Sequence, residues 1–319
     1  MGKKKAAVAA TAAATRKHHQ QRSTTDGSEQ LVRRAEEVTP GVTSPSHMNS
    51  ILMDFPDIPQ HDENDPANWR VTIGITPQSL LEQWKQIRDP QPTMIAFYQD
   101  RKGNLYREFS NFYQHKDHGF DFVLPQELLD IATGIIGGRR DNDNDKRQRQ
   151  QRDILFEPIV HCEFSEKAIM LCKAAIMGNS EYYKRIANSK TPTEVKKLGR
   201  QITPWNDKLW ESVVCGVAMS VIRQKFTTTN TPALRDVLLS TGEDKILCEA
   251  TAGDRRWACG ISIKMPKVYE IPSRWKGSNV LGWALMQVRQ EIINSERAKE
   301  QQQQKRRMME QQYIAVETL

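Results

Sequence analysis

One apolar helix pattern limits the folds open to this chain more than any other segment. From Ala168 to Met177 the residues are apolar except for Lys173, and Glu166 stands just ahead of them. A helix that is apolar on nearly all sides must lie in the interior of a domain. Glu166 and Lys173 are two turns apart, and seven steps of 100° return to within about 20° of the starting direction, so both side chains project from one face.

The residues alone leave two interpretations of this charged pair open. In the first, Glu166 favours the helix dipole from the first turn, and Lys173 extends its amine out of the core. In the second, both charges line a cleft and act on one substrate, because buried charge is costly unless it is paired or used. A single helix does not decide between them.

The order of the remaining patterns predicts a mainly α (α+β) domain with a few short strands. Ser165 is expected to cap the helix that carries Glu166, and Thr191 and Glu194 form a capping-box pattern around a proline at the first helical position. The other expected elements are helices over 77–87 and 209–226, a helix opened by Thr231-Pro232 and ended by Gly242, strands over 94–98, 153–160 and 245–250, a turn over 100–104 that leads into a further strand, and a last helix that packs until about 293 and is polar beyond it.

Polar and charged residues gather at the ends of the chain. Residues 1–25 carry six lysines and arginines and no acid, which is most of the formal net charge of +7. We therefore assign the basic pI to a disordered tail and linker over 1–60, and not to a nucleic-acid-binding core. The folded domain is expected over 70–295, with a solvated surface insertion over 139–152 and a polar helical or disordered tail over 296–319.

Simple counts disfavour several classes of protein. No run of 18 apolar residues occurs, so no membrane span is expected. The N-terminus lacks the apolar core of a signal peptide; a transit peptide stays an alternative to a basic tail or a nuclear-targeting patch. The five cysteines are scattered and lack a CxxC pair, which favours reduced thiols, no metal site, and a cytoplasmic or nuclear location.

Two loop segments carry candidate binding residues. "YREFSNFY" (106–113) places Ser110 and Asn111 beside Phe112, which suits either a β-hairpin edge with a turn or polar contacts next to a flat wall for a planar ligand. In "CEATAGDRRW" (248–257), Glu249 is interpreted as an ordinary surface-loop acid. Asp254 and Trp257 are candidates because loops also carry function.

The last helix offers one face of spaced residues. Asn279, Gly282, Met286 and Arg289 follow one another at steps of three, four and three, so they line one side of the helix. Gly282 costs roughly 1 kcal/mol in a helix relative to alanine, so it needs a packing or ligand reason. The free N–H groups at the start of this helix would suit a phosphate.

Taken in order, these segments resemble the NADAR, or YbiA-like, family of N-glycosidases. The motifs that carry the resemblance are Phe109-Ser110-Asn111-Phe112, Ser165-Glu166 with Lys173, Gly199-Arg200, Trp210-Glu211-Ser212-Val213, "LLSTGEDKIL", Trp257 and "NVLGWALMQVR". The chain departs from the family's pattern in "RRWACG", where the family has W-G, in the longer connector "ISIKMPKVYEIPSRWKGS", and in the insertion over 139–152. These departures bear on substrate choice more than on reaction type.

The resemblance implies a YbiA-like orthogonal helical bundle and cleavage of the N-glycosidic bond between a ribose and a base. It favours Glu166 and Lys173 as site residues. Glu166 would stabilise the ribose cation or activate water, and Asp254 would orient water or a ribose hydroxyl. Lys173 would either hold a phosphate or attack the ribose C1′ as a neutral amine. The implied substrate contacts are Ser110, Asn111, Phe112, Trp210, Trp257, Asn279, Gly282 and Arg289.

The implied substrate is of the nucleotide type, and no cofactor or metal is expected. It is either ADP-ribose on guanine, in a nucleoside or in DNA or RNA, or a ribosylamino-pyrimidine phosphate of riboflavin synthesis. One alternative is a non-catalytic ADP-ribose or NAD-binding module, and another is an interaction scaffold that acts through the basic tail and the Gln/Arg-rich C-terminal helix. The presence of both Glu166 and Lys173 favours the enzyme, because a binding module has no need of both.

Overall fold

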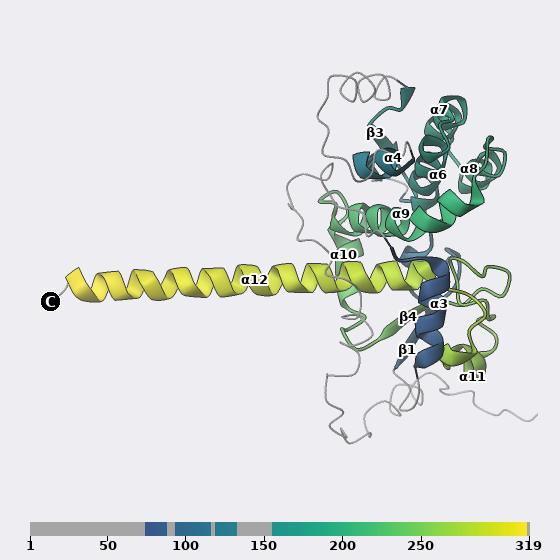
Figure 1. Cartoon of the computed structure of the whole chain (residues 1–319). Coiled ribbons are helices and arrows are strands. Elements are labelled where there is room, and N and C mark those ends of the chain that lie inside the picture. Colours follow the sequence, from purple (N-terminus) through teal and green to yellow (C-terminus); the bar gives the residue numbers. More distant parts are fainter. Residues whose placement is uncertain (1–73, 88–92, 116–118, 133–154, 318–319) are drawn as a thin grey trace, which may run out of the picture. The chain divides into compact units, whose positions relative to one another are not determined.

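The computed structural model describes residues 74–87, 93–115, 119–132 and 155–317. The predicted tail over 1–60 and the predicted insertion over 139–152 lie outside these ranges. The described residues are mostly helical, with four short strands in two separate pairs (Figure 1). The mainly helical class is therefore confirmed, while the orthogonal arrangement of the helices stays a prediction.

The helices and strands alternate irregularly along the chain. The described helices are α3 (Pro77–Gln86), α4 (Gln126–Ala132), α6 (Ser165–Ile176), α7 (Ser180–Asn188), α8 (Pro192–Gly199), α9 (Asp207–Thr227), α10 (Pro232–Leu239), α11 (Pro266–Tyr269) and α12 (Val280–Glu317), with the 3₁₀ helices η2 (Arg107–Phe109) and η3 (Pro272–Arg274). The described strands are β1 (Met94–Phe97), β2 (Phe120–Val123), β3 (Ile159–Cys162) and β4 (Ile246–Glu249).

Each strand pair joins segments that are distant in the sequence. β1 and β4 run parallel, with Phe97 opposite Glu249. β2 and β3 run antiparallel, with Phe120 opposite Cys162. Parallel strands need a long crossover connection, and here it contains α4 and the helices from α6 to α10. The pairing therefore brings the end of β4 back to the segment that follows β1.

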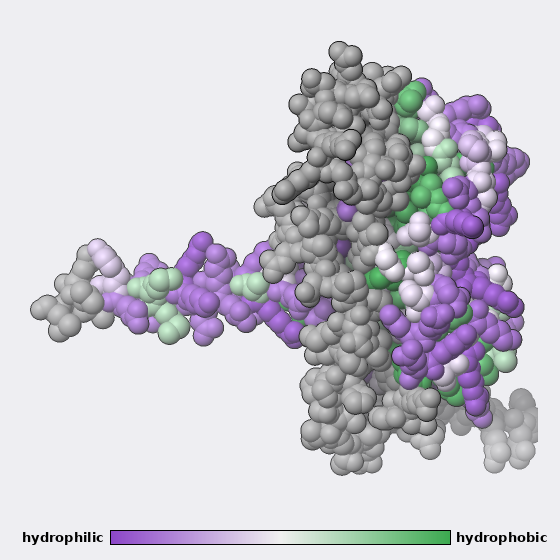
Figure 2. Space-filling view, in the orientation of Figure 1, coloured by the Kyte–Doolittle hydropathy of each residue, from purple (hydrophilic) through white to green (hydrophobic). Residues whose placement is uncertain are grey.

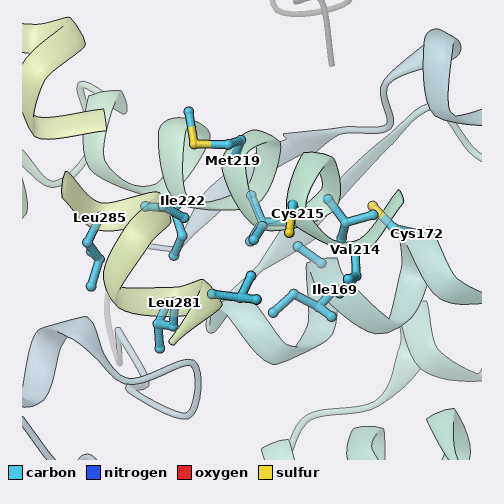
Figure 3. Close-up of a cluster of buried hydrophobic side chains, with 14 of the residues drawn as sticks. Ile169, Cys172, Val214, Cys215, Met219, Ile222, Leu281 and Leu285 are labelled. Carbon is cyan, nitrogen blue, oxygen red and sulfur yellow. The ribbon is translucent and has the colours of Figure 1, made fainter. Parts of the chain in front are cut away.

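Three helices share the centre of the core. α9 packs against both α6 and α12, and apolar side chains from all three meet in one cluster (Figure 3). The side chains that Figure 3 labels are Ile169 and Cys172 of α6, Val214, Cys215, Met219 and Ile222 of α9, and Leu281 and Leu285 of α12. Burial of this cluster stabilises the fold at roughly 25 cal/mol per Å² of apolar surface removed from water, and it packs α6 against α9.

The last helix has two different halves. The residues of α12 from Val280 to Val288 are buried, whereas those from Lys299 to Tyr313 are exposed (Figure 2). A helix can continue without a packed face when its residues have high helix propensity, as Gln, Lys, Arg, Glu and Met have. In the described part of the chain, no helix is long and apolar enough to cross a bilayer.

Several predicted boundaries are confirmed by the structure. α3, β1, α9 and β4 lie where the patterns placed them. Thr191 caps α8, and its side chain accepts the N–H of Glu194 at 3.3 Å. α10 begins after Thr231 but ends at Leu239, and Gly242 adopts a positive φ of 73° in the turn beyond it.

Two strand predictions are wrong. The turn over 100–104 leads into η2 and not into a strand, because Phe109 is drawn into the core against Phe97 and Phe226. The strand predicted over 153–160 begins only at Ile159. Proline has no N–H to donate to a strand partner, and Pro158 precedes the paired residues.

The predicted cap of α6 is also wrong. Phe164 occupies the N-cap position, Ser165 is the first helical residue, and its hydroxyl has no hydrogen-bond partner among the described residues. The N–H of Glu166 instead donates to the carbonyl of Asn111 at 2.9 Å. The start of α6 is thus satisfied by a loop from another part of the chain, which ties the two segments together.

Candidate active site

The α6 carboxylate lies in the interior. Glu166 is 7% exposed in the first turn of α6. Burial raises its pKa from 4.5 to about 7, since a buried carboxylate loses hydration. Lys196 and Lys173 oppose this rise and Asp254 adds to it, so all three charges act on Glu166. A carboxyl group with a pKa near neutrality can both accept and donate a proton in catalysis.

The α6 lysine faces the same region and is half-buried. The Lys173 amine donates to the carbonyl of Gly199 at 2.6 Å and lies 4.3 Å from the centre of the Trp205 ring. Burial lowers its pKa, Arg256 lowers it further, and Glu166 raises it. Glu166 and Lys173 thus influence each other's pKa across one face of α6, and their action on a common substrate stays a prediction.

A second buried carboxyl group joins the site from β4. The Oε2 atom of Glu249 is buried and has no hydrogen-bond partner among the described residues. Burial raises the pKa of Glu249 to about 8, and the nearby Asp254 and Glu166 raise it as well. The interpretation of Glu249 as a surface-loop acid is therefore wrong: it ends a buried strand. The apolar stretch "ILC" (246–248) directly before it was the available signal.

The third carboxyl group is oriented by its own loop. Oδ1 of Asp254 accepts the backbone N–H of Arg256 at 3.0 Å and that of Trp257 at 2.8 Å. Arg256 forms ion pairs with Glu211 and with Asp207 of α9. The loop is thus held against α9, and one oxygen of Asp254 is fixed by backbone donors.

Glu166, Glu249 and Asp254 form an acidic group of neighbouring charges. The pKa of Glu166 and the pKa of Glu249 are both raised by Asp254, and Glu166 also raises the pKa of Glu249. Because Glu166 and Glu249 interact, their protons leave in steps that belong to the pair. The raised pKa values of about 7 and about 8 bring Glu166 and Glu249 close to neutrality, the range in which a carboxyl group can serve as an acid or a base.

The loop after η2 faces the start of α6. Oδ1 of Asn111 is buried and has no hydrogen-bond partner within the described ranges. The hydroxyl of Ser110 accepts the N–H of Phe112 at 3.2 Å, and the amine of Lys196 lies 4.8 Å from the centre of the Phe112 ring. Unsatisfied buried acceptors in a native site call for an explanation such as a ligand or water; contact between Asn111 and a substrate stays a prediction.

A buried lysine fixes this loop from behind. Lys225 of α9 is fully buried and donates to the carbonyls of Glu108 at 2.7 Å and Ser110 at 3.2 Å. Burial lowers the pKa of Lys225 to about 7, and Glu108 acts in the opposite direction. Both bonds are to main-chain oxygens, so Lys225 sets the path of the backbone just before Asn111.

The predicted aromatic walls differ in their access to solvent. Trp210 is 3% exposed and lies behind Trp205, with ring centres 6.0 Å apart. Trp205 is 41% exposed and stands next to the Lys173 amine. Trp257 is partly buried in the Asp254 loop. Sequence analysis missed Trp205, and no periodic pattern marks it because it lies between two helices.

Asn279 and Gly282, both predicted as substrate contacts, lie where the start of α12 packs against β4. The side-chain amide of buried Asn279 donates to the carbonyl of Leu247 at 2.8 Å and accepts the N–H of Glu249 at 3.0 Å. A Cβ on Gly282 would lie 2.1 Å from the Leu247 carbonyl oxygen, so glycine allows α12 to approach β4 closely. These contacts position Glu249, and they account for Gly282 by packing.

Arg289, further along α12, uses its guanidinium group in hydrogen bonds within the protein. It is 1% exposed and donates to the hydroxyl of Thr241 at 2.8 Å and to the carbonyls of Lys245 at 2.8 Å and Glu243 at 3.3 Å. These bonds hold the turn between α10 and β4. Across the described ranges, no group of three or more His, Cys, Asp and Glu side chains is placed to hold a metal ion.

Comparison with known proteins gives the family. The NADAR domain profile matches residues 96–293. Over 128 residues the chain is 31% identical to "N-glycosidase R617" of Acanthamoeba polyphaga mimivirus, covering 40% of this chain and 72% of that protein. Over 145 residues it is 29% identical to "Protein irg-1" of Caenorhabditis elegans, covering 45% of this chain and 66% of that protein.

One solved structure is also similar. The NMR structure of the E. coli protein YbiA aligns at 22% identity with a TM-score of 0.41, covering 66% of this chain and 92% of YbiA. The family itself follows from the profile, which spans well over half of the sequence and includes Glu166, Lys173, Glu249 and Asp254. The chain belongs to the NADAR domain family.

Proposed function

We propose that this protein is an N-glycosidase that hydrolyses the bond between a ribose carbon and a base nitrogen. Removal of ADP-ribose from guanine is the preferred reaction, and cleavage of a ribosylamino-pyrimidine phosphate of riboflavin synthesis is the second. The observation that carries the proposal is the acidic group of Glu166, Glu249 and Asp254, whose buried members Glu166 and Glu249 have raised pKa values, together with Lys173 on the same face of α6 as Glu166. Family membership and the name of the mimivirus relative, an N-glycosidase, support it.

The chemistry needs both a carboxylate and an acid. As the C1′–N bond lengthens, positive charge develops on the ribose, and a nearby carboxylate stabilises it. In the proposed reaction, ionised Glu166 takes this role and accepts a proton from the attacking water, whose oxygen forms the new bond to C1′. Asp254, with one oxygen already fixed by backbone donors, orients that water or a ribose hydroxyl through the other.

The departing base nitrogen also needs a proton. Glu249 is the candidate donor, because its raised pKa keeps it protonated at neutral pH and its buried Oε2 has no partner in the described structure. After one turnover Glu166 holds a proton and Glu249 lacks one, so exchange with solvent restores both groups. The proton balance is thus closed within the acidic group.

Lys173 has two candidate roles in this site. As an ammonium ion it would hold a phosphate or a leaving-group oxygen, and its bond to Gly199 and its contact with the Trp205 ring both favour the charged form. As a neutral amine it would attack C1′ of the opened sugar and displace the base, which leaves with the proton from Glu249; water would then hydrolyse the resulting Schiff base and release the ribose and the amine. Its lowered pKa favours the second role.

Asn111 and Phe112 would contact the base or ribose.

A substrate panel tests the proposal directly. ADP-ribosylated guanosine, an ADP-ribosylated oligonucleotide and a ribosylamino-pyrimidine phosphate are each incubated with the full-length protein, and free ADP-ribose, free ribose phosphate and free base are measured. We expect release from at least one substrate, lost in Glu166→Gln and retained in Glu194→Gln, a change at an exposed glutamate of α8. Tight binding of ADP-ribose without release from any substrate would contradict the enzyme and indicate the binding module.

A further inference from the structure

Trp205 stands apart from the other aromatic residues near the site. It lies in the connection between α8 and α9, directly before Asn206, the N-cap of α9. It is 41% exposed, whereas the neighbouring Trp210 is 3% exposed. A large apolar ring gains by leaving water, so an exposed tryptophan beside a candidate site calls for a partner that covers it.

The indole is held in place from one side. The Lys173 amine lies 4.3 Å from the centre of the Trp205 ring, and the Trp210 ring is inclined to it by 52° at 6.0 Å. The connection is anchored on both flanks, since Asn179 donates to the carbonyl of Thr203 at 2.6 Å and Leu209 donates to the side chain of Asn206 at 3.0 Å. The amine lies against part of the ring, and 41% of the residue stays exposed to solvent.

We propose that Trp205 is a specificity-determining residue of this site, whose exposed ring face stacks on the planar base of the substrate. This inference rests on the proposed function and adds the residue that recognises the base. Stacking needs only a flat ring that is already fixed, because little conformational freedom is then lost on binding. The same indole contacts the Lys173 amine, so the proposed stack would stand next to one of the candidate groups of the site.

The surroundings of the ring suit a phosphorylated ligand. Arg200 ends α8 and Lys208 lies in the first turn of α9, and both are exposed on either side of the connection. Asp207 is exposed as well, but it lies 4.0 Å from Arg256 and is partly neutralised by it. A purine offers more area to the indole than a pyrimidine, so Trp205 would favour purine substrates.

Kinetics of Trp205→Ala and Trp205→Phe test this assignment. Removal of one base–aromatic stack is expected to raise KM roughly tenfold, with kcat within about twofold of wild type, and phenylalanine should restore most of the loss. The ratio of kcat/KM for a purine over a pyrimidine substrate should fall in the alanine variant. A merely structural role would not change this ratio. A fall in kcat with KM unchanged would overturn the proposal, because Trp205 would then act through Lys173.

Equilibrium binding separates this inference from the proposed activity. Guanosine 5′-monophosphate and a short single-stranded oligonucleotide are titrated into the Glu166→Gln protein, and intrinsic tryptophan fluorescence is followed. We expect quenching that Trp205→Phe reduces, and that Tyr313→Ala, a change at an exposed ring of α12, leaves intact. Equal quenching with and without Trp205 would overturn the stacking role even if turnover is found. If the quenching is lost in the Trp205 variant and the wild-type protein shows no turnover, the stacking role of Trp205 is supported and only the proposed hydrolysis is refuted.

Discussion

Replacing Glu166 by glutamine should make the folded protein more stable at high pH and catalytically poor. The folded-state pKa of about 7 lies above the ordinary value of 4.5. Between these two values the folded protein therefore binds more protons than the unfolded chain, and its stability falls as pH rises through that window. The difference corresponds to about 3 kcal/mol at about 1.36 kcal/mol for each pH unit.

The assay is chemical denaturation of wild type and Glu166→Gln at pH 4 and at pH 8. The variant loses the ionisation, so its free energy of unfolding relative to wild type should rise by about 3 kcal/mol between these pH values. The constant cost of burying an amide cancels in this comparison. Glu194→Gln is the control, because an exposed glutamate of α8 should contribute no more than about 0.5 kcal/mol.

The same variant should lose at least roughly 100-fold in turnover, the lower end of acid–base contributions. Because the Glu166 charge raises the pKa of Glu249, its removal should also lower the pKa of that second carboxyl group. The remaining activity of the variant should therefore begin to decline at a lower pH than the activity of wild type, because Glu249 loses its proton at a lower pH. Equal pH dependence of stability in wild type and variant would refute the burial argument, and near-wild-type turnover would remove Glu166 from the mechanism.

Three further predictions concern other parts of the chain. With an ADP-ribose substrate, borohydride should trap an adduct on Lys173, and Lys173→Arg should abolish turnover; a normal rate in the variant with no adduct by mass spectrometry would leave only a charge contact. Deleting residues 1–50 should leave turnover of a nucleoside substrate unchanged and weaken the salt dependence of nucleic-acid association, so aggregation or lost turnover would show that the tail belongs to the domain. Gly282→Ala should lower the unfolding free energy by about 1–3 kcal/mol, because the new methyl group meets the Leu247 carbonyl; Gly253→Ala, in open space, is the control by denaturation.

The α6 half of the site was accessible from the sequence. The relation between Glu166 and Lys173 depends only on the helical period, which a local pattern reveals. Their roles as catalytic groups came from the family resemblance and stay proposals. Asn111 was also in the resemblance, and its carbonyl receives the N–H of Glu166, a contact that no spacing could indicate because the two residues meet only in the folded chain.

The β4 half depended on tertiary structure. Glu249 is enclosed because β4 pairs with β1 and because the side chain of Asn279 binds the Leu247 carbonyl and the Glu249 N–H. Neither β1 nor Asn279 is near Glu249 in the sequence, so the local pattern predicted an acidic residue in a surface loop. The same cause explains η2, where aromatic residues suggested a hairpin but burial of Phe109 and the bonds from Lys225 impose a 3₁₀ turn.

The length of α12 gives the molecule a built-in spacer. The helix starts one residue after Asn279, which anchors β4, and it continues for 38 residues to Glu317. At 1.5 Å per residue its axis is roughly 57 Å long. A dye, an affinity tag or a solid support attached at the far end would therefore be held several nanometres from the carboxyl groups. Distance measurements between that end and a bound fluorescent nucleotide would use the helix as a fixed reference.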